Sequence, residues 1–388
     1  MMMNPFDYAY PVRVHFGAGT LEKSLEAELP QYGKNVLLAY GGGSIKRTGV
    51  YDKLKNVLRV AGKEVFDFGG IMSNPTYAKV QEGAKLAKEH GIDFILAVGG
   101  GSVIDCCKVV SVQAKTNKDI WTLEYEEKGK PAAGIPFGAI VTASGTGAEM
   151  NNGAVITNEE RGQKSPLWGS FADFAILDVE TMLTLPKKQV ISGAFDTLSH
   201  AMETYLGTPR TSNLSDEMGE AVMRSVIRNL RRVVKDEKDV EARSELAWAS
   251  AMAENGILKL GKTTDFQAHM IEHQLGAFTN CNHGAGLAVI HPALYRHLAK
   301  AAPKQFARLA TEVFGVEPAG RSEEELALAM PEALTAFIKE IGMPMTLTEL
   351  GITDDNILRK TADTCILTSG CAKKLTRDEV YEILQECK

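Results

Sequence analysis

The sequence predicts an α/β domain built around a largely parallel sheet, followed by an all-helical domain. Short apolar runs alternate with helix-like polar stretches through the first half of the 388 residues, which is the pattern of βαβ units. From about Leu185 onward, long stretches of 3.6-residue periodicity replace that pattern, and no strand is expected among them. Because 388 residues exceed one ordinary core, we place the domains at 1–186 and 187–388.

The first expected elements are four strands, each a short apolar run. They are NVLLAY (35–40), EVFDFG (64–69), DFILAVGG (93–100) and GAIVTAS (138–144). An amphipathic helix is expected at 79–90, between the second and third strands. The second half contains three long helical patterns, at 214–236, 239–260 and 323–342. Strands that alternate with helices imply crossover connections, so the strands should run parallel.

The bulk composition excludes several classes of protein. A formal charge of −6 argues against nucleic acid and anionic membrane surfaces as partners. The amino-terminal residues lack a basic segment followed by an apolar one, so we expect no secretion signal. No apolar run approaches the roughly 18 residues of a membrane-spanning helix. The six cysteines fit no zinc ribbon or CxxC motif, and reduced thiols in a cytoplasmic protein are the simplest interpretation.

A glycine-rich turn follows the third expected strand, in AVGGGSVIDCCK (97–108). A junction of this kind, where a strand ends and a helix begins, points free N–H groups and the positive helix end at a phosphate. The turn lacks GxGxxG spacing, so it differs from the usual dinucleotide fingerprint, and a tight turn without a ligand is the alternative. Its placement favours phosphate binding and a Rossmann-like, dinucleotide-binding domain.

A second glycine turn, in LLAYGGGSIKRTG (37–49), bears on the choice of cofactor. Enzymes that bind NAD often place a carboxylate near the adenosine ribose, and that group would repel a 2′-phosphate. No acid lies at this turn, and Lys46 and Arg47 follow it. The turn therefore favours NADP(H) over NAD(H). The alternative is that the two basic side chains are simply solvated.

A third segment, VTASGTGAEMNNGAVIT (141–157), places small and hydroxyl residues in a predicted loop after an apolar strand. Its surface suits contacts with a diphosphate and a ribose, yet on its own it could be only a polar loop. Lys164 follows and could reach a ribose or a phosphate, although an isolated lysine is more often a surface residue.

Histidine and aspartate recur at metal-ligand spacing in the second half. Asp196 and His200 are four residues apart, so on a helix they share one face. His269 and His273 repeat that spacing, and His283 follows after a loop-like Asn-Cys-Asn. Asp196 and the histidines at 200, 269 and 283 give three imidazoles and one carboxylate without a thiolate. That set describes a catalytic divalent metal site with an open position, and both Fe(II) and Zn(II) suit it.

These motifs together resemble the iron-dependent (group III) alcohol dehydrogenase family over essentially the whole chain. AILDVETMLTLPKKQVISGAFDTLSHAME (175–203) and HMIEHQLGAFTNCNHGAG (269–286) are similar to the two signatures of that family. YGGGSIKRTGVYD, GGIMSNPTY and AVGGGSVID look most like its butanol dehydrogenase and broad aldehyde reductase branch. The chain departs from the family pattern, but at no proposed metal ligand, at four positions: Cys106, Cys107, Ala148 and Val179.

The resemblance implies roles for particular residues. The implied metal ligands are Asp196, His200, His269 and His283, with Fe(II) favoured and Zn(II) as the alternative. His273 matches a non-ligand histidine beside the substrate. The implied cofactor contacts are Gly99, Gly100, Gly101, Ser102 and Asp105 at the pyrophosphate, Thr142, Thr146, Asn151, Lys164 and Asn74 along the cofactor, and Gly42, Gly43 and Ser44 at the turn that receives a 2′-phosphate. The family also implies a cleft between the two domains and a homodimer.

The expected reaction is hydride transfer between NADP(H) and a small aliphatic alcohol or aldehyde, with a metal polarising the carbonyl. His273 is expected to pass a proton between the substrate oxygen and solvent. Glu203 shares the helix face of the first two ligands, but we interpret it as a non-ligand. His291 and His297 fit no ligand spacing and are interpreted as structural residues.

Three other functions are alternatives to this expectation. An NAD(H)-dependent diol or lactaldehyde dehydrogenase is the alternative within the same family. Chemistry of the dehydroquinate synthase or polyol phosphate dehydrogenase kind needs several basic groups near the metal, and the surroundings of the ligands are too apolar for that. A non-catalytic nucleotide- or metal-binding regulator needs no open metal position, so the intact ligand set argues against it.

Overall fold

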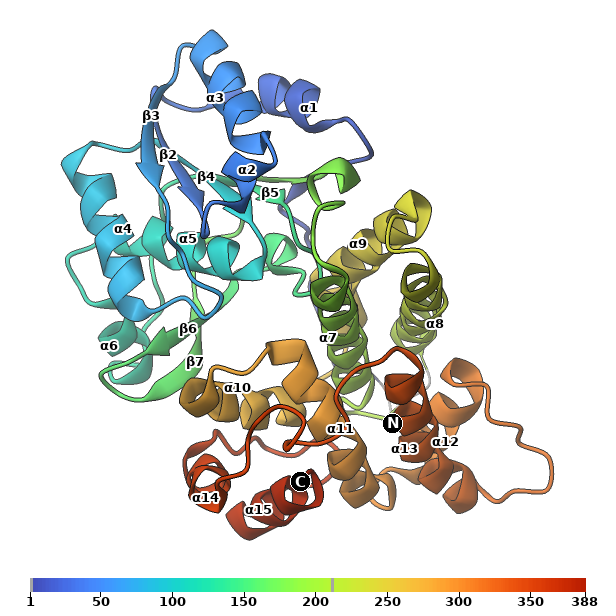
Figure 1. The fold of residues 1–388 in the computed structure, drawn as a ribbon. Coiled ribbons are helices and arrows are strands. Elements are labelled where there is room, and N and C mark those ends of the chain that lie inside the picture. Colours follow the sequence, from blue (N-terminus) through green and yellow to red (C-terminus); the bar gives the residue numbers. More distant parts are fainter. Residues whose placement is uncertain (1–2, 211–212) are drawn as a thin grey trace. The chain divides into compact units, whose positions relative to one another are not determined.

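The computed structural model describes residues 3–210 and 213–388, which form two compact units (Figure 1). One unit comprises residues 9–186 and contains every strand of the described chain. The other comprises the described residues from 187 to 388 and is helical. Residues 3–8 cluster with the helical unit. Among the described residues, no helix combines the length and apolarity needed to cross a bilayer.

The α/β unit contains a six-stranded sheet in which every pair of neighbours is parallel, so the predicted fold class is confirmed. The strand order is β1-β8-β5-β4-β2-β3. The strands are β1 (Arg13–Phe16), β2 (Asn35–Tyr40), β3 (Glu64–Phe68), β4 (Phe94–Gly99), β5 (Phe137–Val141) and β8 (Phe174–Leu177). The four expected strands are β2 to β5. Two strands of four residues, β1 and β8, were not expected, because so short a run carries little pattern.

Helices cover both faces of this sheet. They are α1 (Leu21–Glu28), α2 (Ser44–Arg47), α3 (Val50–Val60), α4 (Tyr77–Glu89), α5 (Gly101–Gln113) and α6 (Ile120–Tyr125), with short 3₁₀ turns at Leu29–Gln31, Ala148–Met150 and Val179–Thr181. On one face, α1 and α3 pack on alternate side chains of β2 and β4, such as Val36 and Leu96. Helices α4 and α5 pack together and α5 contacts β4 and β5. At Gly83 on α4 a β-carbon would lie 2.7 Å from Phe68, so only glycine allows this approach.

A β-hairpin extends the α/β unit and corrects one prediction. Strands β6 (Gly153–Asn158) and β7 (Gln163–Trp168) pair antiparallel. The predicted loop at 141–157 is therefore wrong for its last five residues, which lie in β6. Side chains along β6 alternate between partly and fully buried, and Gly162 takes a positive φ of +58° in the turn. Small residues concealed this alternation in the sequence, because glycine, alanine and threonine contrast weakly in polarity.

The helical unit consists of helices alone in the part of the chain that the structure describes. They are α7 (Lys187–Tyr205), α8 (Leu214–Lys235), α9 (Val240–Glu254), α10 (Gln267–Thr279), α11 (His283–Ala299), α12 (Pro303–Arg308), α13 (Glu323–Glu340), α14 (Asp355–Thr364) and α15 (Arg377–Glu386), with a 3₁₀ turn at Ile257–Lys259 and a π turn at Leu309–Val313. Helices α8 and α13 confirm two expectations. The helix expected at 239–260 ends at Glu254, because Gly256 takes a φ of +87°.

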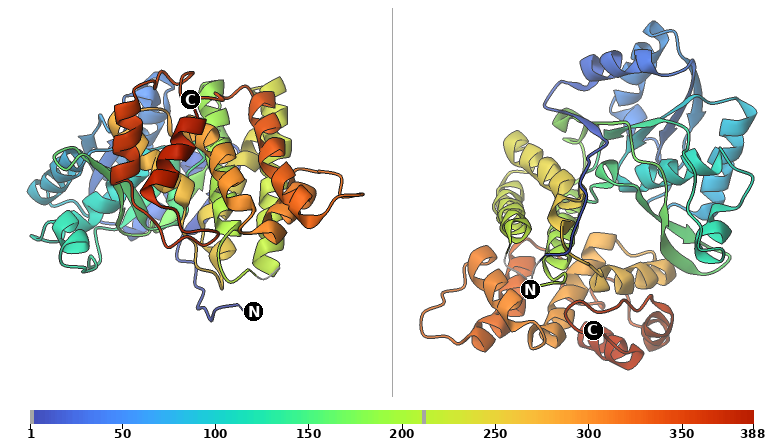
Figure 2. Two further views of the ribbon diagram at one scale, coloured as in Figure 1. Left: turned by 90° about the horizontal axis from the view of Figure 1, so that it is seen from below. Right: turned by 180° about the vertical axis from the view of Figure 1, so that it is seen from behind.

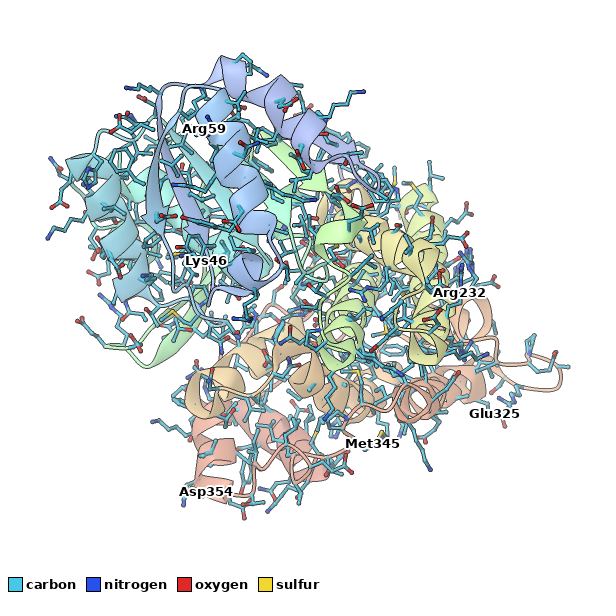
Figure 3. All side chains as sticks on the ribbon, turned by 45° about the horizontal axis from the view of Figure 1, so that its top comes forward. Lys46, Arg59, Arg232, Glu325, Met345 and Asp354 are labelled. Atoms are coloured by element: carbon cyan, nitrogen blue, oxygen red, sulfur yellow. The ribbon has the colours of Figure 1, made fainter. Side chains whose placement is uncertain are left out.

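Local sequence signals fix the ends of these helices. A capping box starts α13, where the Ser322 hydroxyl accepts from the Glu325 N–H and the Glu325 carboxylate accepts from the Ser322 N–H (Figure 3). Arg232 near the end of α8 bonds Asp239 and Glu241, so it joins α8 to the start of α9. Helices α14 and α15 lie side by side (Figure 2). The centre of the unit is α7, which is buried along most of its length.

Candidate functional site

Helix α7 carries the first two residues of the predicted metal set. Asp196 and His200 lie one turn apart on the same face of α7. Asp196 is 3% exposed, and its Oδ1 atom has no hydrogen bond among the described residues. A buried carboxylate oxygen without a donor costs free energy unless a cation or a donor compensates it. Asp196 therefore marks a position at which a ligand is needed.

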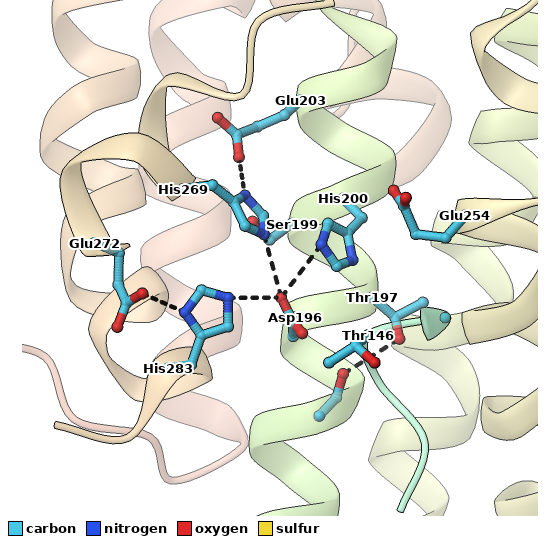
Figure 4. A network of polar contacts seen from close by, with 12 residues as sticks. Thr146, Asp196, Thr197, Ser199, His200, Glu203, Glu254, His269, Glu272 and His283 are labelled. Carbon is cyan, nitrogen blue, oxygen red and sulfur yellow. Dashed lines mark hydrogen bonds and ion pairs between the residues drawn. The ribbon is translucent and has the colours of Figure 1, made fainter. Parts of the chain in front are cut away.

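Three imidazoles converge on that oxygen (Figure 4). The Nε2 atoms of His269 and His283 lie 3.4 Å from Asp196 Oδ1, and the Nε2 atom of His200 lies 3.8 Å from it. His269 comes from α10 and His283 is the first residue of α11. In a tetrahedral site with bonds of about 2.1 Å, two ligand atoms stand about 3.4 Å apart. The distances to Asp196 are therefore compatible with a divalent cation of the Fe(II) or Zn(II) kind, and the ligand atoms of Asp196, His200 and His269 lie within 4.8 Å of one another.

The protonation of this cluster follows from its charges. Burial alone would raise the pKa of Asp196, but attraction to His200 and His283 outweighs burial and holds that pKa well below its usual range. Burial would lower the pKa of His269, yet the carboxylates of Glu203 and Asp196 outweigh it and raise the pKa to about 10. Burial does lower the pKa of His200. The cluster thus favours positive charge at its centre, which a divalent cation would supply.

Two glutamates contact the far sides of the ligand rings. The Nδ1 atom of His269 donates to Oε2 of Glu203, and the Nδ1 atom of His283 donates to Oε2 of Glu272. The sequence predicts that Glu203 is not a ligand, and its contact in the structure is with His269 Nδ1, on the side of that ring away from Asp196. Sequence reasoning missed Glu272. No spacing along one helix signals this contact, because Glu272 lies on α10 and His283 begins α11.

The other histidines stand in different surroundings. The ring of His273 lies 5.8 Å from that of His269 and 5.3 Å from that of His283, measured between centroids, and it is 6% exposed. His273 therefore borders the cluster. His291 bonds Ser199 at 2.6 Å, and burial lowers its pKa to about 4, so it is neutral near pH 7. His297 bonds the Glu386 carboxylate at 2.7 Å.

The predicted phosphate turn lies at the carboxyl end of β4. Gly99 ends β4, and Gly101 starts α5. A β-carbon at Gly101 would lie 2.4 Å from the Thr146 hydroxyl, so the backbone of this turn packs tightly against the loop after β5. Thr142 begins that loop and donates its N–H to the Gly99 carbonyl. Ser102 donates its hydroxyl to the carbonyl of Ser73, the residue before Asn74. The predicted residues of these three segments thus gather at one edge of the sheet, where α/β proteins bind nucleotides.

Asp105 and Asn151 contact a buried lysine that sequence reasoning missed. Lys108 on α5 is fully buried, and its Nζ atom donates to Asp105 Oδ1 at 3.2 Å, Asn151 Oδ1 at 2.9 Å and the Gly153 carbonyl at 2.6 Å. Asp105 Oδ2 also accepts from the N–H of Val155. These contacts tie α5 to β6. A cofactor role for Asp105 and Asn151 stays a prediction, as does one for Lys164, which is buried on β7.

Glu149, beside the same loop, supplies a prediction about stability and pH. Burial raises its pKa to about 7 against 4.5 for the free side chain, although Lys108 opposes the shift. The folded chain therefore binds more protons than the unfolded chain between these values, so stability falls as pH rises through that window. The native chain should lose about 2 kcal/mol in its free energy of unfolding between pH 5.5 and pH 8 that the Glu149→Gln variant does not lose. Urea unfolding at both pH values measures this, and an equal difference at the two would contradict it.

The turn after β2 combines an open backbone with an unexpected acid. Gly43 takes a φ of +89°, and a β-carbon there would meet no atom within 4 Å; the same space surrounds Gly42. Lys46 is exposed, and its Nζ atom lies 4.8 Å from the Tyr40 ring and 4.7 Å from the Tyr51 ring. Tyr51 donates its hydroxyl to the carboxylate of Asp67. Asp67 belongs to β3, the neighbouring strand, so the turn sequence alone did not reveal it.

Comparison with known proteins matches this arrangement to one family. The model described as "Iron-containing alcohol dehydrogenase" matches residues 11–179, and the model described as "Fe-containing alcohol dehydrogenase family, C-terminal" matches residues 190–387. The chain is 39% identical to "Probable NADH-dependent butanol dehydrogenase 1" of Bacillus subtilis (strain 168), over 99% of both chains. It is 32% identical to "NADPH-dependent aldehyde reductase YqhD" of Escherichia coli (strain K12), over 92% of this chain and 91% of that one.

A solved structure agrees with these matches. The crystal structure of NADH-dependent butanol dehydrogenase A from Thermotoga maritima superimposes with a TM-score of 0.92 at 34% identity, and 99% of each chain is covered. The chain therefore belongs to the iron-containing alcohol dehydrogenase family, and the resemblance inferred from its motifs is confirmed. Within that family it is an NAD(P)-dependent oxidoreductase that acts on the alcohol group.

Proposed function

We propose that this chain is a metal-dependent alcohol dehydrogenase and aldehyde reductase that exchanges hydride between NADP(H) and small aliphatic substrates of the butanol and butanal type. The observation that carries the proposal is the convergence of three imidazole Nε2 atoms on the buried Oδ1 atom of Asp196. The names of relatives support the substrate class, since two of them are a butanol dehydrogenase and an aldehyde reductase.

The roles in this proposal follow from the chemistry of the donor set. Asp196, His200, His269 and His283 would hold the metal, with Fe(II) favoured and Zn(II) as the alternative. When bound, the metal supplies Lewis acidity for the carbonyl oxygen and the nicotinamide supplies the hydride. His273 borders the ligand rings and moves a proton between a ring nitrogen and the substrate oxygen. An imidazole can both accept and donate a proton, which suits transfer in both directions.

The role of His273 gives a direct prediction. We expect His273→Asn to lower kcat for butanal reduction about 100-fold, because general acid catalysis contributes at least that much, and to leave the metal content unchanged. Steady-state rates and elemental analysis of the same preparation measure both quantities. His297→Asn is the matched control, since His297 contacts Glu386 and no proposed ligand. Loss of metal from His273→Asn would contradict a role outside the ligand set.

The cofactor part of the proposal rests on the turn after β2. A 2′-phosphate is favoured by the open space around Gly42 and Gly43. The hydroxyl of Ser44 lies beside these glycines, and Lys46 lies nearby. Asp67 on β3 and the four relatives named NADH-dependent butanol dehydrogenases favour the alternative, NAD(H). The ratio of kcat/KM for NADPH to that for NADH decides between them. We expect a ratio above 1, and a ratio below 1 overturns the NADP(H) preference alone.

The remaining roles are part of the same proposal. The proposed cofactor contacts are Asn74, Gly99, Gly100, Gly101, Ser102, Asp105, Thr142, Thr146, Asn151 and Lys164, together with the turn at Gly42, Gly43 and Ser44.

A relative named 1,3-propanediol dehydrogenase, from Klebsiella pneumoniae and 30% identical, supports the diol alternative. Rates with butanal, butanol, 1,3-propanediol and lactaldehyde test the substrate class, and we expect butanal to give the highest kcat/KM. A cytoplasmic homodimer is proposed by family analogy, and light scattering tests the dimer.

A further inference from the structure

The three proposed ligand imidazoles are held in two different ways. In His269 and His283, the Nδ1 atom donates to a glutamate carboxylate. In His200, the Nδ1 atom is buried and has no hydrogen bond among the described residues. The ring of His200 is instead stacked on the ring of His269, with centroids 4.5 Å apart and planes inclined by 15°. Hydrogen bonding therefore fixes two of the three rings.

Glu203 contacts both His269 and the first turn of α10, the helix that carries His269. Its side chain is buried, and it projects from α7, two turns beyond Asp196. Oε2 accepts from His269, while Oε1 accepts from the N–H of Ala268 at 2.6 Å. Ala268 lies in the first turn of α10, where N–H groups lack partners within the helix. The carboxylate thus fixes both the ring of His269 and the end of the helix that carries it.

Glu272 performs the equivalent task between α10 and α11. It is fully buried on α10 and accepts from His283, the first residue of α11. The thiol of Cys281 lies 3.7 Å from its other oxygen. A β-carbon at Gly286 would lie 2.9 Å from the Glu272 side chain, so the first turn of α11 closes directly over the carboxylate. Glu272 consequently has little freedom to turn away from His283.

We propose that Glu203 and Glu272 are positioning residues for the metal. Each keeps a proton on Nδ1 of its histidine, so that the lone pair of Nε2 faces Asp196, and each places a negative charge behind its ligand. The proposal rests on the metal site of the proposed function and extends it to two residues outside the ligand set. With neutral imidazoles, Asp196, Glu203 and Glu272 give the buried cluster three negative charges. A divalent cation offsets most of that charge, which is costly to bury unpaired.

Substitutions can separate the hydrogen bond from the charge. Glutamine keeps an acceptor oxygen at the same reach but removes the charge, alanine removes both, and aspartate keeps the charge but shortens the reach by one methylene. Substitution of a carboxylate that contacts a metal-binding histidine typically lowers the metal affinity 10–100-fold. At both positions we therefore expect the native chain to bind the metal most tightly, the glutamine variant less tightly and the alanine variant least tightly. The aspartate variant should also bind the metal less tightly than the native chain.

The experiment uses Co(II) as the probe, because its visible absorption reports ligand geometry. The affinity of the metal-free protein for Co(II) is measured by competition with a chelator, for the native chain and for Glu203→Gln, Glu272→Gln and the alanine and aspartate series. Glu220→Gln is the control, since Glu220 is a buried glutamate of the same unit that contacts Tyr205 and Arg308. We expect 10- to 100-fold weaker binding and an altered visible spectrum for the variants at 203 and 272, and binding within about 2-fold of native for the control.

The outcomes separate this inference from the proposed function. Folded variants at 203 and 272, verified by circular dichroism, that bind Co(II) with native affinity and spectrum overturn the positioning role alone. A loss of affinity as large in Glu220→Gln also overturns it, because the effect would then be a general consequence of neutralising a buried glutamate. A native chain that binds no Co(II) overturns the proposed metal site and this inference with it.

Discussion

Asp196→Asn is expected to remove the bound metal and to lower the rate of butanal reduction at least 1000-fold. Asp196 Oδ1 is the atom on which all three imidazole Nε2 atoms converge. An amide keeps the shape but removes the negative charge that holds the cation. Lewis-acid stabilisation is worth several kcal/mol of the barrier, and about 4 kcal/mol corresponds to a factor of 1000 in rate. The measurements are kcat and metal content per chain.

The control for this variant is Asp354→Asn. Asp354 is exposed and caps α14 by accepting the N–H of Asn356 (Figure 3). We expect it to keep native metal content and native kcat. The assignment of Asp196 fails if Asp196→Asn retains one metal per chain together with more than a tenth of the native activity.

Lys108→Met is expected to be the most destabilising single change in the α/β unit. Lys108 is fully buried and donates to Asp105, Asn151 and the Gly153 carbonyl, so it links α5 to the β6–β7 hairpin. Methionine fills a similar volume but leaves the largely buried Asp105 carboxylate without its cation. Removing one partner of a buried ion pair costs about 3–5 kcal/mol. For a unit of this size the expected decrease in Tm is roughly 10 °C.

Thermal unfolding of the metal-free protein measures this effect. Lys115→Met is the matched control, because Lys115 is exposed just beyond the end of the same helix. We expect its Tm to stay within about 2 °C of native, as for most surface substitutions. If Lys108→Met unfolds at the native Tm, the buried lysine does not hold the hairpin.

The parts of the fold that were predictable share a physical cause. Strands β2, β4 and β5 are runs of apolar residues that end in glycine turns or polar loops, and a parallel strand buried on both faces requires such a run. Strand β3 lies at the edge of the sheet, and its sequence EVFDF is correspondingly more polar and more exposed. Strand β8 is as apolar as β2, β4 and β5, but its four residues are too few for a pattern. Strand β6 alternates between buried and partly exposed positions, yet small residues such as Gly153 and Ala154 blur the contrast in its sequence. Strands that are short, or whose residues contrast weakly in polarity, are therefore the ones that the sequence does not predict.

Some residues of the candidate site could likewise be predicted from the sequence, and others could not. Asp196 and His200 could be paired from sequence because helical spacing fixes which residues share a face. The contacts of Glu272 with His283 could not be predicted, since they depend on how α10 and α11 pack and not on spacing along one helix. Lys108 was overlooked for a different reason. A lysine in an apolar helix reads as a surface residue until the hairpin that buries it is known.

Cofactor preference shows where sequence proximity misleads. The turn at 41–44 contains no acid, and on that ground the sequence favours NADP(H). Parallel pairing of β2 with β3 nevertheless places Asp67 beside Tyr51 and Lys46. A carboxylate supplied by a neighbouring strand is invisible to a search of the turn itself. The measured ratio for the two cofactors therefore tests the electrostatics of this corner, whatever the substrate.

Reconstitution of the metal-free protein with Fe(II) is the most direct test of the metal-dependent reaction. The protein is treated with a chelator, returned anaerobically to one equivalent of Fe(II), and assayed for oxidation of NADPH and of NADH with butanal. We expect no turnover after chelation and recovery of most of the native rate with Fe(II), together with partial recovery with Zn(II). Full activity in the chelated protein, or none in any metal form with either cofactor, would contradict a catalytic metal held by Asp196, His200, His269 and His283.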